Sequence, residues 1–335
     1  MKKALIYLST IAVLLAIIVV GLGAYTRLTN AGLGCPDWPG CYGQLHLPQS
    51  ETARAAAQAL YPDQPIEATK AWTEMIHRYL AGTLGIFIIS GFILSLWRRR
   101  NWRLPGFLCC WLIFQAALGM WTVTWRLLPV VVMGHLLSGA ILFVGLCLWR
   151  SELASYRPPS LPVMRRWFMF GVIIILLQMA LGGWVSANYA GVACIGFPMC
   201  NGSWFPLAGL KQGLYLFSPI GESYQGGLLQ SHSRAAIQVL HRMGAMVTAA
   251  YLIWVIYLLR HKTTHLFWRR MSWVVLLLLA CQWALGIINV VYFLPLPIAV
   301  MHNVVAVLLL SVVSLLCYWS GQAPSPNAEF EGINK

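Results

Sequence analysis

The chain has 335 residues, of which 59% are hydrophobic and only 10% are charged. About a quarter of the residues of a soluble domain are usually charged, so this composition excludes a soluble globular domain and a disordered chain. The formal net charge of +14 would also suit a nucleic-acid-binding protein. Instead, the length and number of the apolar stretches indicate a polytopic membrane protein.

Eight stretches are long enough to cross a bilayer, which takes about 20 apolar residues. We expect membrane helices at roughly 4–26, 75–97, 104–125, 127–149, 167–185, 237–259, 272–293 and 298–319. The first stretch is too long for the apolar region of a signal peptide and has no small-residue cleavage site, so we expect it to be retained. The predicted fold class is an all-α integral membrane protein with eight transmembrane helices.

Short basic clusters predict the orientation of these helices. The clusters and the chain ends hold 15 of the 23 Lys and Arg residues: Lys2, Lys3, Arg98, Arg99, Arg100, Arg103, Arg150, Arg157, Arg165, Arg166, Arg260, Lys262, Arg269, Arg270 and Lys335. By the positive-inside rule they lie in the cytoplasm. Both termini are then cytoplasmic, residues 321–335 form a disordered cytoplasmic tail, and the basic charge needs no nucleic-acid partner.

The two long connections, at about 27–74 and 186–236, are expected on the outer side of the membrane. Each is too long for a simple connecting loop and is expected to be partly ordered. Within the first, the Ala-rich stretch Glu51–Leu60 favours a surface helix.

The two halves of the chain repeat each other. Residues 23–41 align with 182–200 at an offset of 159, residues 74–78 align with 238–242 at 164, and 115–119 align with 282–286 at 167. The matches include Cys, His, Pro and Arg, which hydropathy alone does not supply. We therefore expect two tandem four-helix bundles, at 1–150 and 151–320, related by a pseudo-twofold axis along the membrane normal.

Four histidines fall inside predicted helices at one level near the outer face: His77 and His135 in the first half, and His241 and His302 in the second. An ionisable side chain there is a candidate functional group. Two imidazoles that face each other across a bundle suit the axial ligation of haem iron. The alternative is that each is a buried hydrogen-bonding residue. Zinc or copper is disfavoured, because the ligands come from separate helices without a third or fourth partner.

Small residues and cations near these histidines fit the haem interpretation. Room for a flat macrocycle would come from Gly82, Gly85, Gly134, Gly139 and Gly244. The cations Arg78 and Arg242 directly follow their histidines and could pair with propionates near the interface.

Cysteines are paired in the outer connections, as Cys35 with Cys41 and Cys194 with Cys200. Because this side is oxidising, we expect a disulfide within each pair. Two roles remain open: a structural staple over the bundle, or a redox-active pair that exchanges electrons or thiols.

The halves differ at two positions that carry charge. Glu74, three residues before His77, corresponds to Gln238, and Arg27 corresponds to Ser186. A carboxylate on the same helix face as a haem-ligating histidine can relay protons or stabilise positive charge. We therefore place chemistry in the first half and a permanent electron-relay cofactor in the second. The alternative for Glu74 is an interfacial carboxylate that pairs with Arg78.

Together, these features resemble the haem A synthase family over essentially the whole chain. The motifs that carry the resemblance are T-E-M-I-H-R at 73–78, Gly134-His135, L-H-R at 240–242, Met301-His302 and C-P-D-W-P-G-C at 35–41.

The resemblance implies a multi-pass enzyme of a bacterial-type inner (plasma) membrane that oxidises a methyl group of haem O to a formyl group with water-derived oxygen. Haem b would sit between His241 and His302, and the substrate haem O between His77 and His135, with Glu74 as the catalytic carboxylate. The family associates the Cys35/Cys41 pair with activity, whereas the Cys194/Cys200 pair is not universal in it. Haem O synthase, cytochrome oxidase assembly factors, membrane lipid and a second copy of the chain are the partners to consider.

Two other functions remain open from the residues themselves. A non-catalytic dihaem cytochrome b explains four histidines but leaves the difference between Glu74 and Gln238 unexplained. A haem transporter or chaperone with a thiol gate explains the cysteines and predicts labile haem.

Overall fold

The computed structural model describes residues 2–99, 101–154 and 158–322. Within these ranges eight helices are long and apolar enough to cross a membrane: α1 (Lys2–Leu28), α3 (Ala68–Trp97), α4 (Arg103–Thr124), α5 (Pro129–Glu152), α6 (Pro162–Ala187), α8 (Ser231–Lys262), α9 (Leu266–Val291) and α10 (Leu296–Ser320). The predicted all-α membrane class is therefore confirmed. The expectations for Arg100, Arg157, Lys335 and most of the tail fall outside the described residues.

Local sequence explains where several helices begin. Proline stands in the first turn of α5, α6 and α10, where its missing N–H costs no hydrogen bond. The surface helix α2 (Glu51–Leu60) is confirmed with its expected bounds, and its N-cap Ser50 accepts a hydrogen bond from the Ala53 amide. The remaining short helix, α7 (Leu210–Gly213), packs on α8.

Helices α3 and α8 begin several residues before their expected starts at 75 and 237. Their first turns are the polar segments ATKAWTE and SHSRAAI. An apolar window cannot detect such turns, because they extend the helix beyond its hydrophobic stretch.

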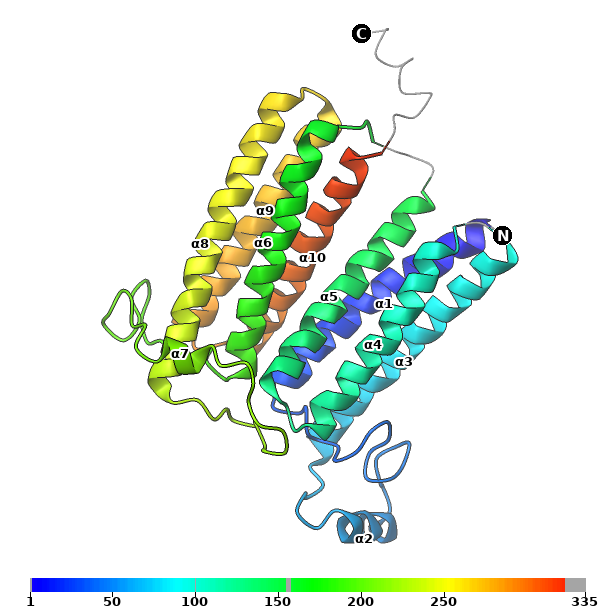
Figure 1. Ribbon diagram of the computed structural model, residues 1–335. Helices are drawn as coiled ribbons and strands as arrows, with labels where there is room; N and C mark the ends of the chain where they lie inside the picture. Colours follow the sequence, from blue (N-terminus) through cyan, green and yellow to red (C-terminus); the bar gives the residue numbers. More distant parts are fainter. Residues whose placement is uncertain (1, 100, 155–157, 323–335) are drawn as a thin grey trace.

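The membrane helices form two groups of four that lie side by side (Figure 1). In the first group α1 and α4 each pack against both α3 and α5, and in the second α6 and α9 each pack against both α8 and α10. Consequently α3 and α5 lie diagonally opposite each other, as do α8 and α10. The groups meet through α5 with α6, α1 with α10, and α5 with α10. We propose that a twofold axis relates the two halves, because such an axis would give this pattern of neighbouring helices.

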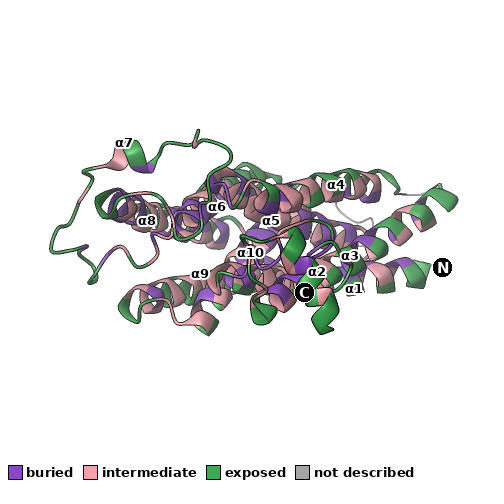
Figure 2. Cartoon of the chain, turned by 90° about the horizontal axis from the view of Figure 1, so that it is seen from below, coloured by how far each residue is buried: buried purple, intermediate pink, exposed green. Residues whose placement is uncertain are grey.

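The long connections that carry α2 and α7 lie at one end of the bundle, here called the loop end, whereas α1 begins and α10 ends at the opposite end (Figure 1). Buried residues lie between the helices, and exposed residues lie along their outer faces and on the long loops (Figure 2). Many exposed side chains on the helices are large and apolar, such as Ile86, Ile113 and Leu277. Their positions suit contact with lipid tails.

Close helix packing away from the loop end predicts the response of two glycines on α3 to substitution. A Cβ at the buried Gly91 would overlap the indole of Trp149, which is 1% exposed, whereas a Cβ at Gly82 would meet nothing within 4 Å. We expect Gly91→Ala to lower the free energy of unfolding by about 1–3 kcal/mol. Gly82→Ala, the matched control, should raise it by up to about 1 kcal/mol through helix propensity. Thermal unfolding in detergent would show this, and equal effects of the two substitutions would contradict the packing.

Candidate functional site

Each of the four helical histidines packs against a glycine of a neighbouring helix. A Cβ on the glycine would lie 3.0 Å from the imidazole Cε1 for Gly23 with His77 and for Gly182 with His241, and 3.1 Å from it for Gly119 with His135 and for Gly286 with His302. Such distances are too short for an ordinary carbon contact. The glycines therefore leave slots between the helices, and each slot is occupied by an imidazole ring.

The histidines of each half project from helices that lie diagonally across their bundle. His77 is on α3 and His135 on α5, and these helices do not contact each other in the described part of the chain. The same holds for His241 on α8 and His302 on α10. The structure thus places the two histidines of each half on diagonally opposite helices, close to the loop end, and their action as a ligand pair stays a prediction.

Three of the four rings also have a glutamine beside them. The amide nitrogen of Gln178 lies 3.0 Å from Nδ1 of His241, that of Gln282 lies 3.2 Å from Nε2 of His302, and that of Gln115 lies 3.5 Å from Nε2 of His135. Gln115 and Gln178 also donate to the backbone carbonyl of their histidine. An amide at this position orients an imidazole and selects which ring nitrogen is free.

His77 has no glutamine beside it. The repeat offset of 159 places Val19 where the second half has Gln178, and a valine side chain offers no hydrogen bond to the ring. The first half therefore orients its two histidines unequally, whereas the second half holds both with side-chain amides.

Sequence reasoning missed these glycines and glutamines as site residues. Of the glycines it proposed, Gly139 and Gly244 lie against the glutamines Gln115 and Gln178, and Gly82 lies on an exposed face. The available signal was the repeat itself, because Gly23/Gly182, Gln115/Gln282 and Gly119/Gly286 are aligned pairs.

Several buried polar atoms test whether the site fits haem. The Nδ1 atoms of His77, His135 and His302 are buried, and no described group hydrogen-bonds to them. The Oε1 atoms of Gln115, Gln178 and Gln282 are in the same situation. A buried polar atom without a hydrogen-bond partner is costly. Coordination to iron would satisfy one nitrogen of each imidazole ring. If the glutamine amide is flipped, its Oε1 would accept a hydrogen bond from the N–H on the other ring nitrogen. Paired imidazoles on facing helices, each with one unsatisfied or amide-bonded nitrogen, therefore fit two axially ligated haems.

Both expected disulfides are present, between Cys35 and Cys41 and between Cys194 and Cys200. We call residues 35–41 and 194–200 the first and second disulfide loops. All four cysteines are at most 2% exposed. The Cys35 sulfur lies 3.9 Å from the Ala71 carbonyl on α3, and the Cys194 sulfur lies 3.8 Å from the Ala235 carbonyl on α8. Each disulfide is thus pressed against the start of a histidine-bearing helix, so thiol exchange would first require its loop to open.

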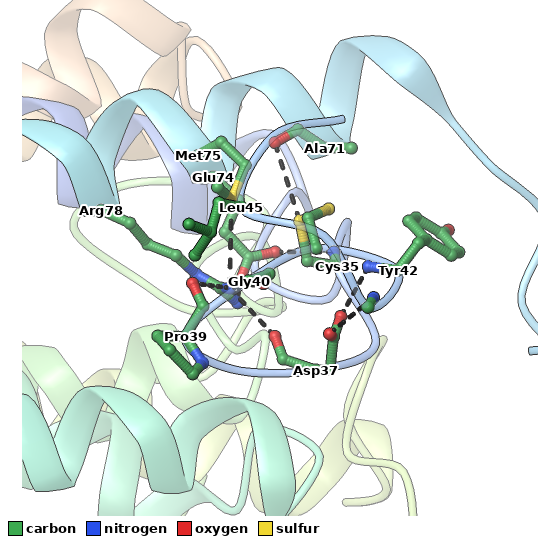
Figure 3. The surroundings of a disulfide bond; sticks show 12 residues. Cys35, Asp37, Pro39, Gly40, Tyr42, Leu45, Ala71, Glu74, Met75 and Arg78 are labelled. Carbon is green, nitrogen blue, oxygen red and sulfur yellow. Dashed lines mark hydrogen bonds and ion pairs between the residues drawn. A yellow bond between two sulfur atoms is a disulfide. The ribbon is translucent and has the colours of Figure 1, made fainter. Parts of the chain in front are cut away.

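Glu74 joins the first disulfide loop to α3. Its side chain is buried, one carboxylate oxygen lies 2.5 Å from Arg78 Nη2, and the other accepts the Cys35 N–H at 3.0 Å. Arg78 donates onward to the carbonyls of Asp37, Pro39 and Gly40 (Figure 3). The structure therefore shows the pairing of Glu74 with Arg78 that the sequence left as an alternative, and it links that pair to the disulfide.

In the second half, the loop is held in a similar way without a carboxylate. Arg242 donates to the carbonyls of Gly196, Pro198 and Met199, and the amide of Gln238 donates to the carbonyl of Gly191 at 2.7 Å. Arg78 and Arg242 both donate to carbonyls of their disulfide loops, and the expectation that they could pair with propionates stays a prediction. The difference between Glu74 and Gln238 leaves the negative charge in the first half only.

These contacts predict how removal of the Arg78 guanidinium affects the reduction of the Cys35–Cys41 disulfide. Arg78→Ala removes the donors to three loop carbonyls and leaves the buried Glu74 carboxylate unpaired, so the Cys35–Cys41 bond should become reducible at much lower reductant concentration. Mass shifts after alkylation would measure this, with Arg54→Ala on the exposed helix α2 as the control. If the two variants resist reduction equally, Arg78 does not hold the loop closed.

Comparison with known proteins places this arrangement in a family. A family model described as cytochrome oxidase assembly protein matches residues 6–314. A heme A synthase of Shewanella oneidensis is 40% identical to the chain, over 94% of this chain and 96% of that protein. Heme A synthases of Sphingopyxis alaskensis and Paracoccus denitrificans are 29% and 27% identical, over 92% and 88% of this chain and 90% and 82% of their own lengths. The chain belongs to the haem A synthase family.

Proposed function

We propose that the protein is a membrane oxidoreductase that converts haem O into haem A by oxidising one methyl substituent to a formyl group. The observation that carries this proposal is the duplicated pair of histidines on diagonal helices, each ring in a glycine slot near the loop end. The names of the relatives over nearly the whole chain support the same reaction. Two similar sites in one chain suit a reaction in which one haem is the substrate and another is the cofactor.

We assign the second half to a resident haem b, which His241 and His302 would hold. Both histidines there are oriented by glutamine amides, an arrangement that favours firm retention. When bound, haem b supplies one-electron redox chemistry. The first half, with His77 and His135, is assigned to haem O; there His77 lacks a glutamine, which suits a porphyrin that must leave after it has reacted.

Glu74 is the residue to which we assign proton handling at the substrate. It lies three residues before His77 on α3, so the two side chains share a face of the helix. Oxidation of the methyl group with oxygen from water releases protons and electrons, and a buried carboxylate in the first half can accept a proton or stabilise positive charge on the substrate. Arg78 and the Cys35 amide hold that carboxylate in place.

For the Cys35–Cys41 disulfide we propose a positioning role. The bond is buried, and the backbone of Cys35 donates directly to Glu74. Loss of the disulfide would therefore disturb Glu74, which gives a physical reason for a dependence of activity on this pair. In the second half the Cys194–Cys200 bond has no carboxylate to position and acts as a staple.

The orientation with both termini in the cytoplasm and the disulfide loops outside is supported by the distribution of Lys and Arg. In this orientation the haem sites lie in the outer leaflet. Delivery by a haem O synthase, contact with cytochrome oxidase assembly factors and assembly with a second copy stay predictions of the family resemblance.

A substitution at Glu74 tests the reaction. Glu74→Gln keeps the size of the side chain and removes its charge, so it should leave bound haem b intact and abolish haem A formation in cells. Haems extracted from the purified protein and from membranes would be resolved by chromatography. Undiminished haem A would remove Glu74 from the mechanism. Two tightly held haem b groups in the wild type, with neither haem O nor haem A, would favour the dihaem cytochrome instead.

The glutamines give a second prediction, about retention of the cofactor. Gln178→Val copies the first half into the second, and we expect it to weaken haem b binding by about 10–100-fold, since removal of a hydrogen bond to a ligating histidine has effects of that size. Gln115→Val, the same change in the first half, is the matched control and should leave haem b in place. The rate of haem transfer to apomyoglobin would measure retention, and equal rates in both variants would contradict the assignment of haem b to the second half.

A further inference from the structure

Arg27, in the last turn of α1, is a cation at the junction of the two halves. Its Nη2 donates to the backbone carbonyl of Ser186 on α6 at 2.5 Å, and its guanidinium carbon lies 4.0 Å from the ring centre of Tyr189. Its Nε is buried and has no hydrogen-bond partner among the described residues. The side chain thus crosses from one bundle to the other with most of its donors unused, since a guanidinium has five.

No carboxylate of the described chain neutralises this cation. Glu67 pairs with Lys70, and Glu74 pairs with Arg78. A partly buried guanidinium in a membrane protein is expensive unless it meets an anion. Arg78 is paired with Glu74 and holds the first disulfide loop. Arg242 donates to the second disulfide loop and, like Arg27, has a buried Nε without a hydrogen-bond partner among the described residues. Arg27 differs from Arg242 in its position, because it bridges the two halves.

The repeat explains why one arginine stands here. Positions 27 and 186 are equivalent in the two halves, at the offset of 159, and they touch each other across the junction. Two guanidinium groups at this contact would repel each other. At this position the second half has Ser186, whose small side chain leaves space for the guanidinium and whose backbone carbonyl accepts its hydrogen bond. A single cation therefore lies at the junction of the two halves.

Arg27 and Ser186 lie closer to the loop end than the glycines that form the histidine slots on the same helices. Arg27 is four residues after Gly23, which forms the slot of His77, and Ser186 is four residues after Gly182, which forms the slot of His241. Four residues are about one helical turn, or about 5.4 Å, along the same face of a helix. The backbone positions of Arg27 and Ser186 therefore each lie about one turn from a histidine slot, and the guanidinium lies at Ser186 between them.

We propose that Arg27 is a carboxylate-binding subsite shared by the two porphyrin sites, where it binds haem propionates. The inference rests on the proposed function, which supplies a haem to each half. A guanidinium is suited to this task because its planar donors match a carboxylate in a bidentate geometry. Stacking on Tyr189 holds the guanidinium in place and leaves its remaining donors available for a carboxylate.

A shared cation also links the two sites electrostatically. Positive charge next to a haem propionate favours the reduced iron, and a second carboxylate on the same guanidinium weakens that effect. The midpoint potential of the haem in the second half should therefore respond to Arg27, although this residue belongs to the first half.

The test is a redox titration of the purified holoprotein followed by absorbance of the bound haem. We expect Arg27→Gln to lower the midpoint potential and Arg27→Lys, which keeps the charge, to recover most of the wild-type value. Arg126→Gln is the matched control: Arg126 is exposed at the same end of the bundle, just after α4, and its loss should leave the potential unchanged.

A binding measurement provides the second arm. Iron protoporphyrin IX and its dimethyl ester, in which both carboxylates are blocked, are added separately to the purified protein. The wild type should prefer the free acid by about tenfold or more, as expected for charged hydrogen bonds, and Arg27→Gln should lose that preference. An unchanged potential together with an unchanged preference in Arg27→Gln would overturn the inference and leave the proposed function standing. A wild-type protein that carries no haem and takes up neither porphyrin would overturn the proposed function itself.

Discussion

The contact between an imidazole ring and a glycine on the next helix is the constraint on which the rest of the molecule depends. It occurs four times, at α1 with α3, α4 with α5, α6 with α8 and α9 with α10. Because a side chain on any of these glycines would meet the ring, each contact limits both the rotation and the depth of the two helices. The four contacts lie in the half of each helix nearer the loop end, and the two histidines of each half stand on diagonally opposite helices, α3 with α5 and α8 with α10.

The loop end builds on that scaffold and introduces the difference between the halves. Each disulfide loop lies against the start of a histidine helix, and an arginine directly after the histidine holds the loop by its carbonyls. In the first half alone, a buried carboxylate joins the loop to the helix. The same architecture thus provides one site with a buried carboxylate three residues before its histidine and another with an amide in that position. A substrate site and a cofactor site require this kind of difference.

Hydropathy and the internal repeat predicted the eight spans, their grouping by fours and the histidine pairs, because these features depend on composition and periodicity along the chain. The early starts of α3 and α8 were missed, because their first turns are polar. The roles of Gly23, Gln178 and their counterparts depend on which helix faces which, and sequence alone does not provide this. The contacts of Arg78 with the first disulfide loop were not predicted for a related reason: the path of the loop decides which acceptors this side chain meets. Arg27 was recognised as a difference between the halves, but its contact with Ser186 appears only once the halves are packed together.

The central claim is that two haems are each ligated by two imidazoles, one pair in each half. Electron paramagnetic resonance of the oxidised protein, prepared with both sites filled, tests it most directly, together with the ratio of iron to polypeptide. The account predicts about two irons per chain, both low-spin with the signature of two axial histidines. A high-spin signal, a histidine–methionine signature or a single haem bound between the halves would contradict it.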